Sequence, residues 1–142
     1  MASIRKVIAI QASAEHVWEA IRDLHAVHRR LAPGFVVDVR PDGDVRIVTF
    51  ANGAVARELI VDVDDRARRL AYSVVESPLQ MTHHHATFEV LREGADASRI
   101  IWIADVWPNS AVERVGPMME QGAQVMKQNL ERTAPRTEAL RA

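Results

Sequence analysis

The fold is decided by an amphipathic stretch in the last third of the chain, SAVERVGPMMEQGAQVMKQNLERT, at residues 110–133. Apolar or small residues recur along it near the helical period, namely Val112, Val115, Met119, Gly122, Met126 and Leu130. A helix over these residues would be about 35 Å long, at ~1.5 Å per residue. The spacing therefore predicts one long helix that buries a single face, and this helix is long enough to cover a sheet.

Two features bear on where this helix begins. Ser110 and Glu113 stand three residues apart, in the pattern of a capping box. Gly116-Pro117 follows at once and interrupts the helical pattern. The proline either kinks a helix that starts near Ser110, or it occupies the first turn of a helix that starts at Pro117. The sequence leaves both alternatives open.

Upstream of the helix, between Gly34 and Pro108, the chain changes to the period of strands. Apolar residues alternate with others in six runs that short turns separate, and one of these turns, Asn52-Gly53, is a strong hairpin signal. Strands joined by short turns are antiparallel, because parallel neighbours need long crossovers. A further strand is expected at residues 3–11, so the sequence predicts a seven-stranded antiparallel sheet.

Two short helices are expected between the first strand and the other six. Ser13 offers a hydroxyl to cap the first helix, and the helix dipole favours the negative Glu15 in its first turn. The second, His25 to Leu31, ends before Pro33, because proline disfavours helical geometry in the residue before it. The predicted fold class is therefore α+β, with a seven-stranded curved antiparallel sheet wrapped around a long C-terminal helix and two short helices after the first strand.

Length and composition set the general class of the protein. The chain has 142 residues, which predicts one domain over residues 1–142. Its formal net charge is -1, so no global charge draws it to nucleic acid or to an acidic membrane. The longest early apolar run, Val7 to Ile10, is too short to cross a membrane. Cysteine is absent, which excludes disulfides and thiolate chemistry and favours a cytoplasmic location.

A set of short motifs runs in order through nearly the whole chain. The stretch IQASAEHVW at residues 10–18 joins a strand to a helix that bears Val-Trp. The later motifs are Asn52-Gly53, Arg57-Glu58-Leu59, Asp64-Asp65-Arg66, Leu70-Ala71-Tyr72, Ile101-Trp102 with Pro108, and Gly122 to Leu130. In order and spacing these motifs resemble the START-like helix-grip superfamily, also called SRPBCC, and within it the polyketide cyclase/dehydrase-like branch.

The resemblance implies an internal cavity but not a particular reaction, because the superfamily includes lipid carriers, hormone sensors and aromatic cyclases. We expect a protein that binds a small hydrophobic or aromatic molecule, such as a lipid or a polyketide-like compound, between the sheet and the C-terminal helix. One alternative is a cyclase or dehydratase that acts in the same cavity. Another is a partner-regulating protein without a ligand, and a homodimer is compatible with each of the three.

Strand pairing sorts the residues that face this cavity. If the last two strands pair around a turn at residues 94–97, the residues opposite each other are Val90 and Ile100, Phe88 and Trp102, Ala86 and Ala104, and His84 and Val106. These residues form an apolar face, which is expected to point inward. The opposite face brings His85 close to Asp105. A slip of one residue would exchange the two faces.

Three polar side chains are candidates for contact with a ligand. His84 would orient the ligand or, in the enzyme alternative, act as a general acid or base. Arg57 shares a face with apolar residues of its strand, so it should meet a carboxylate of the protein or of the ligand. Tyr72 would place its phenol in the same space. With the apolar walls included, the predicted ligand-binding residues are Arg57, Tyr72, His84, Phe88, Trp102, Met119 and Met126.

The consecutive histidines 83–85 are the most conspicuous motif, yet they do not predict a metal site. Consecutive strand residues point to alternating faces, so at most His83 and His85 could share an ion with Asp105. The sequence also has no Gly-x-Ser-x-Gly nucleophile elbow, no Walker loop and no Gly-x-Gly-x-x-Gly. We therefore predict neither a metal nor another cofactor.

Overall fold

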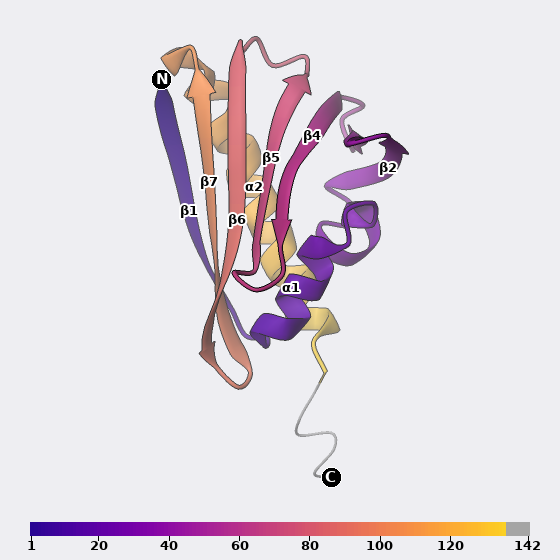
Figure 1. Ribbon diagram of the computed structural model, residues 1–142, viewed down its shortest axis with the longest axis vertical. Coiled ribbons are helices and arrows are strands. Elements are labelled where there is room, and N and C mark those ends of the chain that lie inside the picture. The colour runs from indigo at the N-terminus through magenta and orange to yellow at the C-terminus, as the bar shows by residue number, and fades with distance from the viewer. Residues whose placement is uncertain (136–142) are drawn as a thin grey trace.

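The chain folds into one curved antiparallel sheet whose concave side is closed by helices (Figure 1). The computed structural model describes residues 1–135, so the part of the predicted single domain at 136–142 lies outside the described residues. The elements are β1 (Ala2–Ile10), α1 (Ala14–Arg22), η1 (Val27–Leu31), β2 (Val36–Asp42), β3 (Val45–Phe50), β4 (Val55–Asp64), β5 (Arg69–Glu76), β6 (His83–Gly94), β7 (Ala97–Trp107), η2 (Asn109–Ala111) and α2 (Val112–Thr133).

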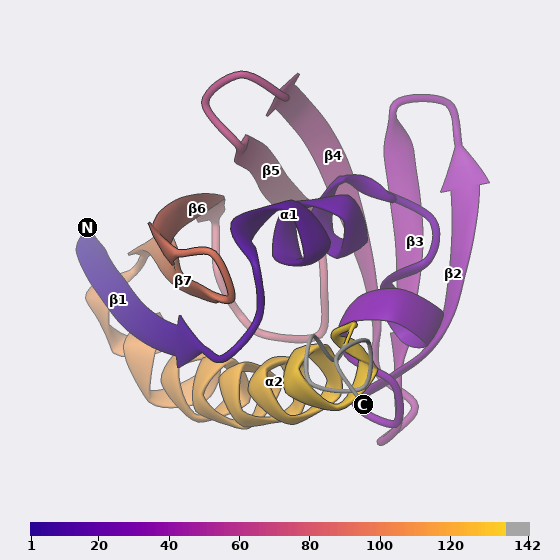
Figure 2. The ribbon, with the colours of Figure 1, turned by 90° about the horizontal axis from the view of Figure 1, so that it is seen from below.

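The sheet has seven strands in the order β1-β7-β6-β5-β4-β3-β2, and all neighbours are antiparallel. β2 to β7 form the predicted meander, and β1 completes the sheet beside β7. Figure 2 shows the sheet bent into a deep arc, with α2 lying along its open side and α1 inside the arc at one end. The predicted α+β fold class is confirmed. Among the described residues, no helix has the length and apolarity to span a membrane.

The helix α2 is continuous through Pro117, which agrees with the first of the two predicted alternatives, a helix that starts near Ser110. It begins at Val112, so Pro117 lies inside the helix and not in its first turn. The predicted capping box is wrong, because no side chain caps α2. The short helix η2 precedes α2 directly, and the backbone N–H of Val112 donates to Asn109 and Ser110. Ser110 is therefore already inside a helical turn and cannot cap from an extended conformation.

Polar contacts hold α2 against both sides of the arc. On the β1 side, Lys127 Nζ donates to the carbonyl of Ala9 at 2.6 Å, and Lys6 pairs with Glu120 at 2.7 Å. On the other side, the buried Asn129 amide donates to the carbonyl of Arg30 in η1 at 2.8 Å. Lys127 and Asn129 thus donate to backbone carbonyls near the ends of β1 and η1.

The pairing of β6 with β7 follows the predicted register at every position that bears on the cavity. Phe88 lies opposite Trp102, and His84 lies opposite Val106. Both pairs are buried on the concave face. His85 lies opposite Asp105 on the outer face, as expected.

Bulges change the inward faces of the other strands. In β4, Glu58 is buried whereas Leu59 and Val61 are exposed, and the pairing with β5 shifts by one residue at Val61. The predicted grouping of Arg57 with an inward apolar face is therefore wrong. In β2 a shift between Val36 and Asp38 leaves Val37 exposed. The outer faces of these strands also carry apolar residues, so alternation alone could not distinguish inside from outside.

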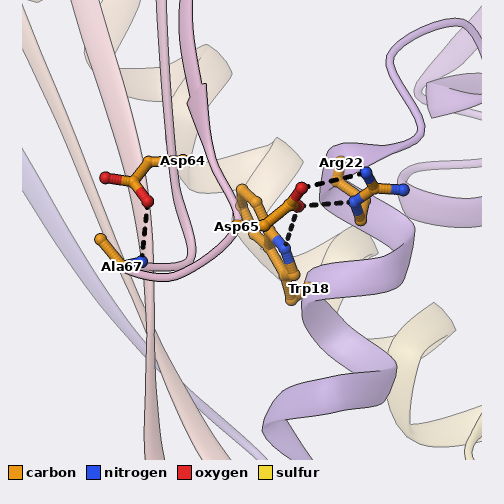
Figure 3. A network of polar contacts seen from close by, with 5 residues as sticks. All are labelled: Trp18, Arg22, Asp64, Asp65 and Ala67. Atoms are coloured by element: carbon orange, nitrogen blue, oxygen red, sulfur yellow. Dashed lines mark hydrogen bonds and ion pairs between the residues drawn. The ribbon is translucent and has the colours of Figure 1, made fainter.

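The turn between β4 and β5 anchors α1 through one carboxylate (Figure 3). Asp65 accepts from the indole Nε1 of Trp18 at 2.9 Å, and from Arg22 at 2.7 and 3.2 Å. Asp64 shapes the turn by accepting from the backbone N–H of Ala67 at 3.0 Å. The hydrogen bonds from Arg22 and Trp18 hold the pKa of Asp65 below its ordinary value.

We predict that the substitution Asp65→Asn lowers the melting temperature at neutral pH, because it removes the ion pair with Arg22 while the turn is kept. A folded-state pKa below the unfolded value means that the stabilisation is fully present above about pH 4 and is lost as pH falls through the folded pKa. Thermal unfolding of both proteins between pH 7 and pH 2.5 measures this. The control is Asp62→Asn, since the Asp62 side chain bonds to no residue within 1–135. A gap between wild type and Asp65→Asn that persists unchanged at pH 2.5 would contradict the prediction.

Candidate ligand-binding cavity

A cavity of about 220 Å³ lies between the concave face of the sheet and α2. Most side chains around it are apolar. The polar or charged side chains among the lining residues are Arg46, Asn52, Glu58, Tyr72, Ser77 and His84. This make-up, an apolar wall with a few convergent polar groups, is typical of a small-molecule site.

The cavity opens at one end of the sheet. Asn52 in the β3–β4 turn and Pro78 in the β5–β6 loop line it and are exposed, while the neighbouring Phe50 and Leu79 are half-buried. Residues such as Arg46, Tyr72 and Trp102 line it deeper and are buried. The cavity is therefore reached between the β3–β4 turn and the β5–β6 loop.

Three stacked aromatic rings form part of the sheet wall. The rings of Tyr72 and Phe88 stack with centroids 5.9 Å apart, and those of Phe88 and Trp102 stack at 4.8 Å. The indole Nε1 of Trp102 donates to the hydroxyl of Tyr72 at 3.1 Å. Burial raises the pKa of the Tyr72 hydroxyl, so this group keeps its proton at neutral pH. The three rings therefore form a continuous aromatic part of the wall, in which the Tyr72 hydroxyl is held by Trp102.

On the helix side, the wall is made by methionines and one glycine. Met119 and Met126 line the cavity as predicted and are buried. A Cβ atom on Gly122 would stand 3.2 Å from Cε2 of Phe35 and 3.4 Å from Cη2 of Trp102. The absence of a side chain at Gly122 thus lets both rings reach the backbone of α2. Thioether side chains on either side can adjust to ligands of different shape.

His84 lies at the cavity wall in its neutral form. Burial lowers its pKa from 6.5 to about 4, and the positive charge that His83 and His85 carry when protonated adds to this effect. Its Nδ1 accepts from the backbone N–H of Val74 at 3.4 Å. That contact assigns the proton to Nε2 on the opposite side of the ring. The described residues provide no hydrogen-bond partner for Nε2, so this N–H is free to donate.

The wall also contains a buried ion pair that the sequence did not predict. Nε of Arg46 donates to Oε1 of Glu58 at 2.8 Å, and the two side chains are 5% and 10% exposed. Nη1 of Arg46 donates to the carbonyl of Leu24 at 3.0 Å. The guanidinium also lies over the Tyr72 ring, 5.5 Å from its centroid.

Arg57 does not face the cavity. It lies on the outer face of β4, where Nη2 donates to Asp42 at 2.6 Å and Nε lies 3.8 Å from Glu76. Its predicted inward orientation is wrong, because Ala56 and Glu58 take the inward positions of β4 and regular alternation turns Arg57 outward. The neighbouring Glu58 takes the inward position and meets Arg46 from β3. The expectation that a buried arginine needs a carboxylate holds for Arg46 instead.

The other six predicted residues, Tyr72, His84, Phe88, Trp102, Met119 and Met126, are brought together around the cavity. Their roles toward a ligand stay predictions. Arg46 and Glu58 were missed, because the sequence carries no signal that marks them as buried. In β3, Arg46 and Val48 lie on one face and Val45 and Ile47 on the other. From the sequence, either face could be the buried one. The structure shows that Arg46 and Val48 are buried and that Arg46 pairs with Glu58.

The outer face of β6 and β7 holds the remaining histidines. His83 is exposed and His85 half-buried, and His85 lies opposite Asp105, which accepts a hydrogen bond from Ser3. Within residues 1–135, no three His, Asp or Glu side chains gather closely enough to hold a metal ion.

A curved seven-stranded sheet that grips a long helix over an apolar cavity defines the class of helix-grip proteins. The sequence model of the family described as polyketide cyclase / dehydrase and lipid transport matches residues 1–138. The chain belongs to this family. The resemblance found in the sequence motifs is thereby confirmed, and with it a ligand-binding type of fold. None of the curated protein sequences matches this chain.

Solved structures with the same fold are distant in sequence. The protein XoxI from Bacillus cereus is 20% identical with a TM-score of 0.82, over 90% of this chain and 94% of that one. A START superfamily protein from Mycobacterium smegmatis is 15% identical with a TM-score of 0.73, over 92% and 97%. Norcoclaurine synthase from Thalictrum flavum, in complex with dopamine and hydroxybenzaldehyde, is 20% identical with a TM-score of 0.68, over 95% and 89%.

The buried ion pair should respond to substitution very differently from its exposed counterpart. We expect Arg46→Met to cost about 3–5 kcal/mol of unfolding free energy, because it leaves the Glu58 carboxylate buried without a partner. Arg57→Met, on the other face of the sheet, removes a partly exposed pair and should cost about 0–1 kcal/mol. Urea denaturation at pH 7 measures both. Equal costs would contradict the burial of the Arg46–Glu58 pair.

Burial of neutral His84 predicts a loss of stability in mild acid. The unfolded chain binds a proton at this residue below about pH 6.5 and the folded chain only below about pH 4. Unfolding is therefore favoured increasingly as pH falls between these values. Because a tenfold change in proton affinity corresponds to ~1.4 kcal/mol, the loss approaches about 3 kcal/mol.

The variant His84→Gln cannot take up this proton. Its unfolding free energy should fall less than that of wild type between pH 7 and pH 4, as measured by urea denaturation. His83→Gln on the exposed face serves as the control and should follow wild type. Parallel profiles for wild type and His84→Gln would show that His84 titrates normally in the folded state.

Proposed function

We propose that this protein binds a small hydrophobic or aromatic molecule, of the lipid or polyketide-like kind, in the cavity between the sheet and α2. The observation that carries the proposal is the apolar cavity of about 220 Å³ with its opening between the β3–β4 turn and the β5–β6 loop. An empty apolar volume is a cost in itself, because its lining atoms lack contact partners. A ligand that fills it gains ~25 cal/mol for each Å² of apolar surface buried.

The size of the cavity favours a compact ligand. An apolar cavity of ~150 Å³ is enough for benzene. A volume of about 220 Å³ therefore suits a molecule of one or two rings within the closed part. A longer lipid-like chain would extend through the opening.

The wall residues suggest how such a molecule would lie. The rings of Tyr72, Phe88 and Trp102 stack on one another, so they would meet an aromatic ligand with their edges, and edge-to-face contact between aromatic rings is favourable. Met119 and Met126 would pack on its other face. The Nε2–H of His84 would donate to a polar group of the ligand. Norcoclaurine synthase, which holds two small aromatic molecules on this fold, supports the proposal by analogy.

Neither alternative function is favoured by a particular observation. A cyclase or dehydratase would need His84 to exchange a proton with its substrate. In the tautomer described above, the basic nitrogen of His84, Nδ1, already accepts a hydrogen bond from the backbone N–H of Val74. Only the Nε2–H is left to contact a ligand. A partner-regulating protein without a ligand would be consistent with a filled interior, whereas this interior has a cavity. A cytoplasmic location and a homodimer remain predictions.

We predict that naphthalene, an apolar two-ring probe, binds the wild-type protein, and that Ala56→Leu weakens this binding at least about tenfold. Ala56 is buried and lines the cavity, so a larger side chain there occupies the space of the ligand. Tenfold corresponds to ~1.4 kcal/mol, the scale of a few apolar carbon atoms. Binding is measured by changes in the NMR spectrum on titration.

The matched control is Val55→Leu, which adds bulk to the adjacent exposed position on the other face of β4. It should bind naphthalene as wild type does. Native mass spectrometry of freshly purified protein adds an independent readout, namely a co-purified small molecule that Ala56→Leu lacks. Absence of binding to wild type, or equal binding by Ala56→Leu, would refute the proposed function.

A further inference from the structure

The Arg46–Glu58 pair leaves two polar atoms without partners. Each residue is more than nine-tenths buried and lines the cavity. Arg46 uses Nε for Glu58 and Nη1 for the carbonyl of Leu24, and Glu58 uses Oε1. Nη2 of Arg46 and Oε2 of Glu58 form no hydrogen bond with residues 1–135. Because both residues line the cavity, these two atoms are available to a polar group on the molecule that fills it.

The pair is held rigidly enough to recognise a ligand. Two hydrogen bonds and the contact with the Tyr72 ring fix the plane of the Arg46 guanidinium. Glu58 lies opposite Arg46 in the β3–β4 ladder, so its carboxylate enters the cavity from the adjacent strand. A donor and an acceptor are thus presented side by side, and little conformational entropy is lost when a ligand binds.

The charges of the pair restrict what this polar group can be. Arg46 is positive and Glu58 negative, so together they are close to neutral. A ligand carboxylate would be attracted by Arg46 but repelled by Oε2 of Glu58. A ligand ammonium would be attracted by Glu58 but repelled by Arg46. A hydroxyl group carries no charge and is both donor and acceptor at one atom. It can accept from Nη2 of Arg46 and donate to Oε2 of Glu58.

The position of the pair relative to the aromatic stack indicates what carries the hydroxyl. Tyr72 lies under the Arg46 guanidinium and also begins the stack that continues through Phe88 to Trp102. A hydroxyl bound at Arg46 and Glu58 therefore places the attached group beside this aromatic part of the wall. A planar ring with the hydroxyl at its edge fits both features at once.

We infer that the ligand of this cavity is a neutral hydroxylated aromatic molecule, and that Arg46 and Glu58 together bind its hydroxyl and select against carboxylates. The inference rests on the proposed function, since it describes the ligand of the same cavity. It replaces the expectation of an arginine that pairs with a ligand carboxylate, because the arginine in the cavity already has its carboxylate.

The test compares four probes with the same two-ring body at pH 7: naphthalene, 2-naphthol, 2-methoxynaphthalene and 2-naphthoate. Wild type should bind 2-naphthol about tenfold more tightly than naphthalene, the scale of a hydrogen bond to a charged group. The methyl ether cannot donate to Glu58 and should lose most of this gain. The ionised 2-naphthoate should bind more weakly than 2-naphthol by tenfold or more. These four measurements need no variant.

The variant Arg46→Met/Glu58→Leu replaces the pair by apolar side chains, which preserves stability better than removing one partner. It should bind naphthalene at least as tightly as wild type and should no longer prefer 2-naphthol. The control Arg57→Met/Asp42→Asn alters the exposed pair and should keep the wild-type preference. In wild type, the NMR signal of the Arg46 Nε–H should shift with 2-naphthol and much less with naphthalene.

The outcomes separate this inference from the proposed function. If none of the four probes binds wild type, the proposed function fails, and the inference fails with it. If naphthalene binds but 2-naphthol binds no more tightly, or if 2-naphthoate binds as tightly as 2-naphthol, the inference alone is overturned. A preference for 2-naphthol that survives in Arg46→Met/Glu58→Leu would assign recognition of the hydroxyl to another residue.

Discussion

A sheet bent this strongly cannot press its whole concave face against one straight helix, and the cavity follows from that geometric constraint. α2 is fastened at the two ends of the arc, to β1 through Lys127 and to η1 through Asn129. Near the middle of α2 the helix backbone comes close to aromatic rings at Gly122, where Phe35 and Trp102 reach it. Side chains fill most of the remaining interior, and the space that they leave is lined by strands from the middle of the sheet.

Burial gives the polar groups of this cavity their chemical character. His84 is neutral because the interior penalises its charged form, and Tyr72 keeps its proton for the same reason. Arg46 and Glu58 remain charged but compensate each other at 2.8 Å. The cavity therefore contains donors and acceptors without a net charge. On a shared fold, function is determined by the residues of the site and not by the architecture alone.

The parts of the fold that the sequence predicted correctly are those where one periodicity dominates. β6 and β7 alternate cleanly around a short turn, so the pairs Phe88–Trp102 and His84–Val106 could be derived by counting. β2 and β4 carry apolar residues on both faces, and each contains a bulge. Counting fails there, because one extra residue reverses every later side chain. The prediction placed Arg57 in the cavity, whereas the structure places the next residue, Glu58, there.

By itself, the sequence determined the order of the elements, the antiparallel sheet, the long closing helix and the aromatic wall, because hydrophobic period and turn residues act locally. Only the tertiary structure decided which charged groups are buried together. Arg46 and Glu58 are twelve residues apart on neighbouring strands, and Leu24, which completes the site, comes from the segment after α1. Their meeting depends on the register of the β3–β4 ladder and on which face of these strands is buried, and neither can be read from the period of the chain.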